Sequence, residues 1–145
     1  MANSEDHSIR PVGLTQSVGY QIGVRRTLRC SKEAAWTYLT SMNGLASWLA
    51  CPNGLVLEQG AIFGQEDAIY GEVRVVRVQE QIRMTWYRPG WSRASTLQIR
   101  LIGVRPSATT VSIHQEHLDD GDIRQAMKVK WEQALADMSE HIARG

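Results

Sequence analysis

The amino-acid sequence predicts an α+β domain in which one long C-terminal helix closes over a curved antiparallel sheet. The first observation is a single apolar stripe at helical spacing near the C-terminus. The residues of this stripe are Ile123, Met127, Trp131, Leu135, Met138 and Ile142. The second observation is a run of strand-like segments over residues 55–117, joined by turn residues without an intervening helical pattern. Connections this short require antiparallel pairing, because a parallel crossover needs a dozen residues or more.

The bulk properties of the chain indicate one soluble domain. Its 145 residues, 43% of them apolar, are enough to bury a core. The formal net charge of +1 gives no overall field that would gather nucleic acid or an anionic membrane. No apolar run approaches the roughly 20 residues that span a bilayer. We therefore expect a cytoplasmic protein that binds no nucleic acid and does not span a membrane.

The N-terminal part of the chain divides into an arm and a strand. Residues 1–17 are polar, are interrupted by proline and glycine, and show no regular periodicity, so we expect a flexible arm. The single domain is then expected to occupy residues 18–145. Residues 18–30 form its first strand, because their apolar residues alternate. These residues are Tyr20, Ile22, Val24 and Leu28.

Two short helices are expected after this first strand. Ser31 can cap the first of them, and apolar residues follow at helical spacing until Asn43 and Gly44 break the pattern. A second helical turn is expected over residues 45–49, before Pro52. Together the two helices form a corner between the first strand and the rest of the sheet.

Six further strands are expected, which makes a sheet of about six to seven strands. Their ranges are 55–58, 61–65, 69–78, 81–87, 94–104 and 109–117. Apolar and polar residues alternate in the longer ones, so one face of the sheet is buried and the other faces water. In the last strand this parity places Gln115 on the inner face, and also His117 unless a bulge shifts the register.

The C-terminal helix is expected to be the longest element. Asp119, Asp120 and Asp122 precede its apolar stripe and suit the positive end of a helix dipole, where they can also cap free amides. The pattern continues for about 25 residues, which corresponds to roughly 37 Å of helix. This is the element that closes the sheet.

The inward-facing side chains are the candidates for a ligand site. Tryptophan offers a flat stacking face with one donor, and methionine adapts its shape, so a set rich in both suits an apolar pocket. Gln115 or His117 at the mouth can orient the polar end of a ligand. The same side chains can also form a filled core. The candidate ligand-binding residues are Trp48, Met84, Trp86, Ile99, Ile113, Gln115, His117, Met127 and Trp131.

No residue pattern predicts a metal site, a cofactor or a catalytic residue. His114, Glu116 and His117 form a close cluster of metal-ligand types, but on a strand His114 and Glu116 project to one face and His117 to the other. Cys30 and Cys51 lie far apart and in no signature of a cysteine enzyme, so we expect reduced, inert thiols.

The loop over residues 88–93 has two interpretations. It places Trp91 between Arg88 and Arg93, an arrangement that can stack a base or grip an anion. The simpler interpretation is a hairpin tip whose tryptophan folds back on the sheet or lies at the edge of a cavity entrance.

Several local motifs resemble those of a known family. Residues 24–49, VRRTLRCSKEAAWTYLTSMNGLASWL, contain a small capping residue, then Trp36 in the first helix and Trp48 in the corner. Further motifs are Gly71 with Glu72, the MTW triplet at residues 84–86, the HQEHL segment ending at Leu118, and Trp131. Their order over residues 18–142 resembles the helix-grip plan of the SRPBCC or START-like superfamily. It most resembles domains homologous to the activator of the heat-shock chaperone ATPase.

This resemblance implies a START-like domain whose sheet and long helix enclose a cavity or groove. Members of the superfamily bind lipids, polyketides and other apolar molecules there, a few catalyse cyclase or hydrolase reactions, and others dock a chaperone. No catalytic signature is shared by all of them, so the fold alone supplies no reaction. We expect a binding protein for a hydrophobic or amphipathic small molecule rather than an enzyme.

Two alternative functions follow from the same resemblance. A chaperone-interacting protein of the heat-shock ATPase activator type would present an exposed apolar patch. A cyclase-like enzyme on an aromatic or polyketide substrate would use His117, Glu116 or Tyr87 as acid or base. The partner is accordingly a small molecule, a chaperone or, in a homodimer, a second copy of the chain.

Overall fold

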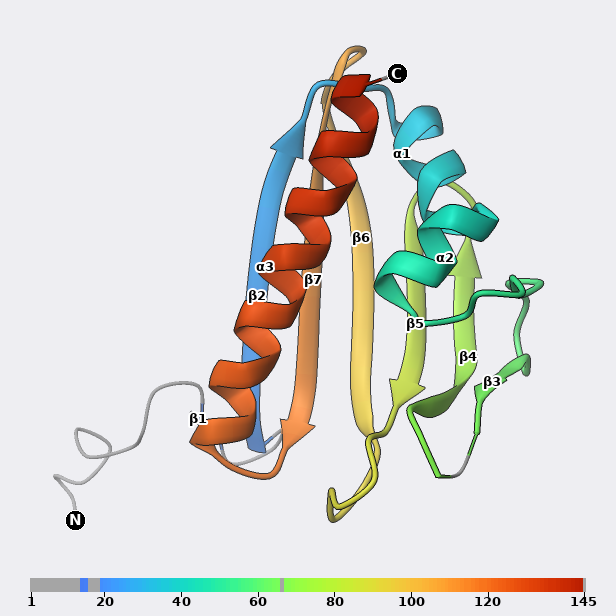
Figure 1. Ribbon diagram of the computed structural model, residues 1–145. Coiled ribbons are helices and arrows are strands. Elements are labelled where there is room, and N and C mark those ends of the chain that lie inside the picture. Colours follow the sequence, from blue (N-terminus) through green and yellow to red (C-terminus); the bar gives the residue numbers. More distant parts are fainter. Residues whose placement is uncertain (1–13, 16–18, 66, 145) are drawn as a thin grey trace, which may run out of the picture.

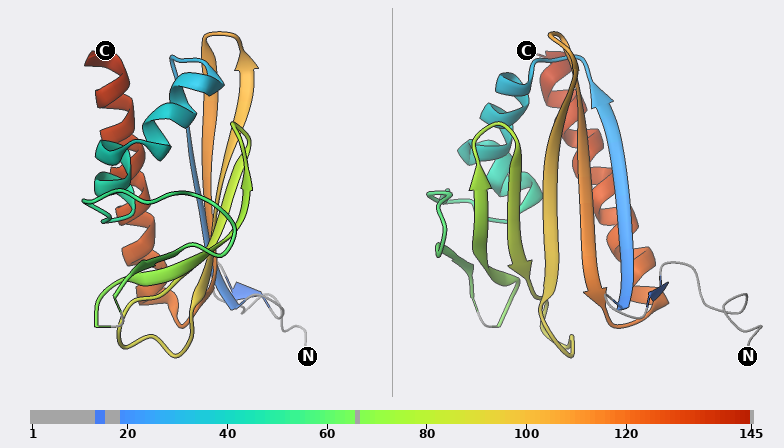
Figure 2. Two further views of the ribbon diagram at one scale, coloured as in Figure 1. Left: turned by 90° about the vertical axis from the view of Figure 1, so that its right-hand side faces the viewer. Right: turned by 180° about the vertical axis from the view of Figure 1, so that it is seen from behind.

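The computed structural model describes residues 14–15, 19–65 and 67–144. The described residues form two layers, a seven-stranded antiparallel sheet and three helices that all lie on one face of it (Figure 1). The opposite face of the sheet is uncovered in the view from behind, and the side view shows the sheet curving toward the helices (Figure 2). The predicted α+β class and curved antiparallel sheet are confirmed.

The strands lie in the order β1-β2-β7-β6-β5-β4-β3. The bounds are β1 (Leu14–Thr15), β2 (Gly19–Leu28), β3 (Ile62–Gly64), β4 (Tyr70–Arg77), β5 (Gln81–Trp86), β6 (Ser95–Arg105) and β7 (Ala108–Leu118). From β3 to β7 each strand pairs with the next, which makes a meander. β2 then lies beside β7, so an early strand and a late strand of the chain are neighbours.

The N-terminal range expected to be an arm contains one described element. β1 pairs with β2 through Leu14 opposite Tyr20 and Thr15 opposite Gly19. The rest of that range, residues 1–13 and 16–17, lies outside the described residues. Its expected flexibility stays a prediction.

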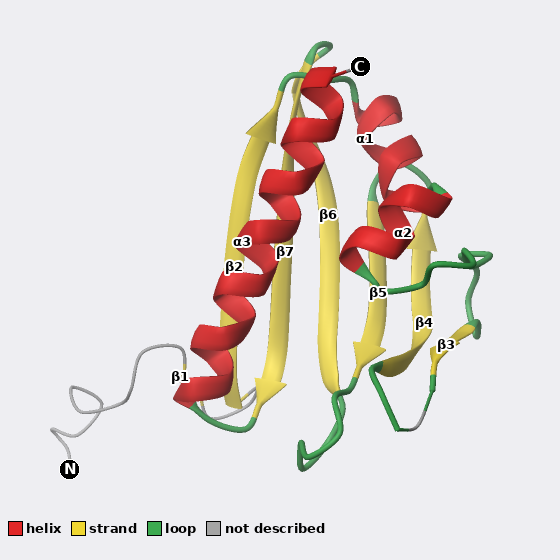
Figure 3. Ribbon diagram, viewed as in Figure 1, coloured by secondary structure: helices red, strands yellow, loops and turns green. Residues whose placement is uncertain are grey.

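The strand predicted over residues 55–58 is wrong, because this segment has no regular structure. The alternation that suggested it is present, since Leu55 and Leu57 are half-buried while Val56 is exposed. However, the segment pairs with no strand of the sheet, and β3, which pairs with Tyr70–Glu72 at the start of β4, is the edge strand. It forms part of the long connection between the helical layer and the sheet (Figure 3).

The two short helices are α1 (Lys32–Thr40) and α2 (Met42–Trp48). As predicted, Ser31 caps α1, and its Oγ accepts a hydrogen bond from the amide of Ala34. The predicted helix break at Asn43 and Gly44 is wrong, since both residues lie inside α2. Gly44 allows α1 and α2 to approach closely: a Cβ there would lie 1.8 Å from the carbonyl oxygen of Tyr38.

The long helix α3 (Gly121–Arg144) has 24 residues and crosses in front of β2 and β7 (Figure 1). Asp120 caps it, because its Oδ1 accepts a hydrogen bond from the amide of Ile123 at 2.8 Å. Met127, Trp131, Leu135 and Met138 of the predicted stripe are buried, and Ile123 and Ile142 pack at its ends. No helix in the described residues has the length and apolarity needed to cross a membrane.

The core lies between the helices and the inner face of the sheet. Cross-strand pairing places Met84, Leu97 and Gln115 in one row, and Ile82, Ile99 and Ile113 in the next. All six side chains are almost fully buried. The predicted division into an inner apolar face and an outer polar face is therefore confirmed.

Candidate functional site

The structure places eight of the nine predicted ligand-binding residues in the buried core. The exception is His117, which is half-buried. β7 has a bulge between the pairs Ile22–Gln115 and Tyr20–Leu118, and His117 has a φ of 68°. Because of this bulge the next inward position is taken by Leu118, which is 2% exposed. The role of the nine residues in binding a ligand stays a prediction.

A chain of buried hydrogen bonds connects α3 to the sheet through Gln115. The indole Nε1 of Trp131 donates to Gln115 Oε1 at 2.7 Å, and Gln115 Nε2 donates to Ser95 Oγ at 2.8 Å. The Ser95 hydroxyl in turn donates to the carbonyl oxygen of Trp86 at 2.6 Å. Gln115 is 0% exposed, so its amide forms hydrogen bonds within the core and does not lie at a cavity mouth.

Three tryptophans pack together beside this chain. The ring centroid of Trp86 lies 5.2 Å from that of Trp91 and 5.7 Å from that of Trp131, the latter in an edge-on arrangement. Trp91 is 8% exposed, so the tip of the 88–93 loop folds back on the sheet. The Nε1 of Trp86 is buried and has no hydrogen-bond partner among the described residues. A buried donor of this kind is uncommon and costs free energy.

Two cationic side chains lie against the tryptophan rings. The guanidinium carbon of Arg88 is 5.4 Å from the ring centroid of Trp86, and Lys130 Nζ is 5.3 Å from that of Trp131. Burial, and secondarily the charge of Arg88, hold the pKa of Lys130 below its usual value. Neither cation has a carboxylate within ion-pair distance in the part of the chain that the structure describes. Together they form a positive site over an aromatic surface.

A pocket of about 620 Å³ adjoins this cationic site where the chain passes from α2 back to the sheet. Its walls come from residues 50–55, from β3 with the turn that follows it, and from the 88–89 segment. Leu55, Phe63 and Ile69 supply apolar surface, Arg88 supplies a positive charge, and the exposed Asp67 supplies a negative one. The volume lies within the range of small-molecule sites. Arg88, which lies over the Trp86 ring, suits the anionic group of a ligand whose apolar body contacts the apolar side chains.

The prediction did not include this pocket. Apart from the short strand β3, its walls come from loops, whose path depends on tertiary packing and not on periodicity. The available signals were the Asn53-Gly54 turn and the Arg88-Pro89 step, both of which indicated only where the chain reverses. The sequence places Arg88 near Trp91, an arrangement that can grip an anion, but the position of Arg88 over Trp86 depends on the fold.

The other candidate chemical groups do not converge. His114 and Glu116 share the outer face, with 3.9 Å between Nδ1 and Oε2. Tyr87 uses its hydroxyl to donate to the carbonyl oxygen of Trp91. His117 has a buried Nδ1 without a hydrogen-bond partner among the described residues. Residues 14–15, 19–65 and 67–144 contain no group of three metal-ligand side chains.

Both cysteines are buried free thiols. Burial raises the pKa of Cys30, and this outweighs a hydrogen bond from the backbone of Ala35 that lowers it. Burial also raises the pKa of Cys51. A raised pKa keeps a thiol protonated at neutral pH, which disfavours a nucleophilic role.

Comparison with known proteins identifies relatives of the whole fold. A family model described as "Activator of Hsp90 ATPase homolog 1-like protein" matches residues 29–143. A comparison with curated protein sequences finds no match.

Solved structures with the same fold include CalU16 from Micromonospora echinospora, with a TM-score of 0.70, 18% identity, and coverage of 84% of this chain and 73% of that one. Another is PFC0360w, an HSP90 activator from Plasmodium falciparum, with a TM-score of 0.71, 15% identity, and coverage of 85% and 96%. A third, MLL2253 from Mesorhizobium loti, has a TM-score of 0.67, 20% identity, and coverage of 86% and 97%. At these identities the likeness shows the fold.

Proposed function

The chain belongs to the family of activator of Hsp90 ATPase homolog 1-like proteins, and we propose that it binds a small amphipathic molecule with one anionic group. The observation that carries the proposal is the pocket of about 620 Å³ that combines apolar side chains in its walls with Arg88 at its edge. The apolar body of the ligand would lie against Leu55, Phe63 and Ile69. Its anionic group would pair with the guanidinium of Arg88.

The predicted ligand-binding residues have a supporting role in this proposal. Trp86 lies beneath Arg88, and Trp91 and Trp131 hold Trp86 in place. Because the guanidinium rests on an indole ring, it is partly desolvated before the ligand arrives. A cation that is already partly desolvated and held in position loses less hydration free energy and less conformational entropy when it pairs with an anion than a fully solvated cation does.

The test is a binding experiment with matched ligands. Dodecanoate and dodecanol share a chain length but differ in charge, so we expect tighter binding of dodecanoate. Tryptophan fluorescence reports the site, and thermal unfolding reports any ligand that prefers the folded state. Replacement of Arg88 by Gln should weaken dodecanoate binding about tenfold or more, because it removes a charge-assisted hydrogen bond. Binding of dodecanol should change little.

A second variant fills the pocket and leaves the charge in place. Ala68 lines the pocket, so Ala68→Phe should weaken the binding of both ligands. Arg105→Gln and Ala126→Phe are matched controls on exposed positions outside the pocket. If neither ligand changes the fluorescence or the melting temperature, or if both pocket variants bind like their controls, the proposal is wrong.

Chaperone docking is a second candidate function, supported by exposed apolar side chains beside the same pocket. Met42, Val56 and Ile62 are 62%, 73% and 66% exposed. Ile62 and Gly54 line the pocket, and the Met42 side chain reaches to within 3.8 Å of the Cβ position of Gly54. Such a group is typical of a protein interaction surface. PFC0360w, with the same fold, is an HSP90 activator.

Capture by the middle domain of an Hsp90-class chaperone tests this second candidate. The double variant Val56→Ser/Ile62→Ser should lose capture, whereas Val104→Ser/Val129→Ser, which changes two other exposed valines, should retain it. Absence of capture by the unmodified protein would exclude this function and leave the small-ligand proposal untouched.

A further inference from the structure

The face of the sheet opposite the helices carries a row of arginines. Cross-strand pairing connects Arg77 to Gln81, Gln81 to Arg100, Arg100 to Ser112, and Ser112 to Arg25. Residues that pair directly across strands project from the same face of a sheet. All three arginines are exposed. One line across five strands therefore presents three guanidinium groups to solvent.

A fourth arginine enlarges this row into a surface. Arg83 is two residues beyond Gln81 on β5 and is exposed on the same face. Neighbouring strands lie about 4.8 Å apart, so Arg77 on β4 and Arg25 on β2 are separated by roughly 19 Å. We call the surface formed by Arg25, Arg77, Arg83 and Arg100 the arginine face.

Three carboxylates around the arginine face already have a basic side chain as a neighbour. The pairs are Glu80 with Lys32, Glu72 with Arg74 at 3.9 Å, and Glu116 with the imidazole of His114 at 3.9 Å. A fourth carboxylate, Glu132, lines a pocket with Arg25 at one end of the face. In contrast, none of the four arginines of the face has an ion-pair partner among the described residues. The net charge of the whole chain is only +1, so this local excess is balanced elsewhere.

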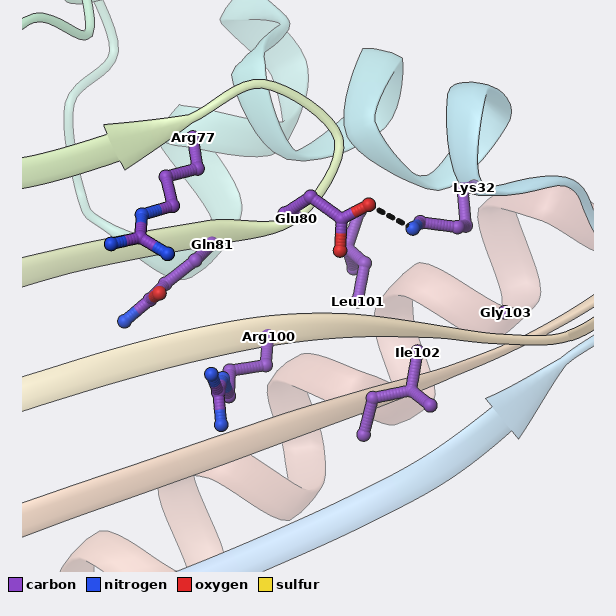
Figure 4. Close-up of a pocket in the computed structure, with 8 residues that line it drawn as sticks. All are labelled: Lys32, Arg77, Glu80, Gln81, Arg100, Leu101, Ile102 and Gly103. Atoms are coloured by element: carbon purple, nitrogen blue, oxygen red, sulfur yellow. Dashed lines mark hydrogen bonds and ion pairs between the residues drawn. The ribbon is translucent and has the colours of Figure 1, made fainter.

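A pocket of about 540 Å³ lies at one end of the face. Figure 4 shows the side chains of Arg77, Gln81 and Arg100 projecting to the same side of the sheet, with the pair of Lys32 and Glu80 beyond them. Because Lys32 neutralises Glu80, the pocket keeps the positive charge of Arg77 and Arg100. The planar guanidinium group binds a carboxylate through two parallel hydrogen bonds.

We propose that the arginine face is a docking surface for an acidic segment of a partner protein, with one carboxylate anchored between Arg77 and Arg100. The span of roughly 19 Å is too wide for a single small anion but suits several carboxylates along a peptide. Nucleic acid is less suited, because the small net charge provides no long-range attraction to a polyanion. The face is separate from the proposed ligand pocket and does not depend on it.

The test is a titration of the full chain with a fluorescent peptide that alternates glutamate and serine over ten residues, followed by anisotropy at low salt. The double variant Arg77→Gln/Arg100→Gln should bind at least tenfold more weakly. The control Arg105→Gln/Arg144→Gln removes the same charge from exposed positions outside the face and should bind nearly as well as the unmodified protein. Arg77→Lys/Arg100→Lys keeps the charge without the guanidinium fork, so intermediate binding is expected. All these positions are exposed, and an unchanged melting temperature checks that each variant folds.

Three results would overturn the proposal. The first is a peptide that does not bind, and the second is an equal loss of binding in the control double variant. The third is tighter binding of a ten-nucleotide single-stranded DNA, or of vesicles with anionic phospholipid, than of the peptide, which would assign the face to another class of partner.

Discussion

At the scale of single residues, buried polar groups decide how the interior is held together. Gln115 contacts α3 through Trp131 and β6 through Ser95. Its amide therefore fixes the position of the helix relative to the sheet. Apolar packing alone would leave that position less specific.

Replacement of Gln115 by Met tests this role. We expect a loss of about 1–3 kcal/mol in the free energy of unfolding, because the buried Nε1 of Trp131 loses its acceptor. Urea unfolding followed by tryptophan fluorescence measures the loss. Gln98, which bonds to Gln81 on the outer face, is the matched control, and Gln98→Met should cost under about 0.5 kcal/mol. Equal losses in the two variants would contradict the assigned role.

The half-buried position of Lys130 should make the free energy of unfolding depend on pH. Its pKa in the folded protein lies below the ordinary value of 10.5, so the unfolded chain binds more protons between those two values. Stability therefore rises with pH in this window, and the cost of the buried charge is fully present below it. Lys130→Met keeps the side-chain stem and removes the charge. The variant should be more stable at pH 7, by under about 1 kcal/mol because solvent screens the site.

The difference in the free energy of unfolding between Lys130→Met and the unmodified protein should become smaller as the pH rises toward 10.5. Urea unfolding at pH 7, 9 and 10.5 measures the difference, and Lys128→Met, which removes a lysine charge from a half-exposed position on the same helix, is the control. A pH-independent difference for Lys130→Met would contradict the interpretation.

The residue scale also shows where sequence patterns stop being informative. The parity of the last strand predicted the inward position of Gln115, because a strand alternates strictly. It left open whether a bulge follows, and at the observed bulge Leu118 takes the inward position in place of His117, since a bulge is set by pairing with β2. The partners of Gln115 come from residues 95 and 131, which no local pattern brings together.

At the scale of elements, the close approach of α1 and α2 explains why a helix contains a residue of low helix propensity. Gly44 lies in α2 against the end of α1, where only hydrogen fits beside the carbonyl oxygen of Tyr38. From sequence, glycine after asparagine indicates a turn, so the break predicted there was wrong for a physical reason. The packing gained between α1 and α2 outweighs the low helix propensity of glycine.

Gly44→Ala should therefore destabilise the protein even though alanine favours helices. We expect a loss of about 1–3 kcal/mol from the forced shift of α1 against α2. Gly121→Ala is the matched control at the start of α3, where a Cβ would lie 3.7 Å from the nearest atom, in ordinary contact. This control should be neutral or slightly stabilising in thermal unfolding. A Gly44→Ala variant as stable as the unmodified protein would show that α1 can shift away from α2 without a loss of stability.

At the scale of the whole molecule, the order of elements was predictable and the position of the pocket was not. The Trp131 stripe, the capped corner and the alternating strands each follow from local periodicity, and together they indicated the fold. The pocket combines residues 50–55 with Arg88, which lie on different loops. The missing strand at residues 55–58 has the same cause, because pairing partners are decided by the assembled sheet.

The sheet order predicts how stability is distributed across the molecule. β7 is paired on both sides and packed against α3, whereas β3 is a three-residue edge strand. In hydrogen exchange we expect the amides of Val111 and Ile113 to exchange near the rate of global unfolding. The amides of β3 should exchange many times faster through local opening. Similar rates in β3 and β7 would contradict this expectation.

The pairing of β2 with β7 has a consequence for the time course of synthesis. Thr27 and Thr110, hydrogen-bonded across these strands, are 83 residues apart in the chain. At a translation rate of about 5–20 residues per second, roughly 4 to 17 s pass between the synthesis of β2 and that of its partner β7. During that interval the inner face of β2 is exposed while the β3–β6 hairpins can already form. In the nascent chain β2 is therefore an unpaired strand for several seconds. We expect a factor that shields this strand to raise the yield of folded protein.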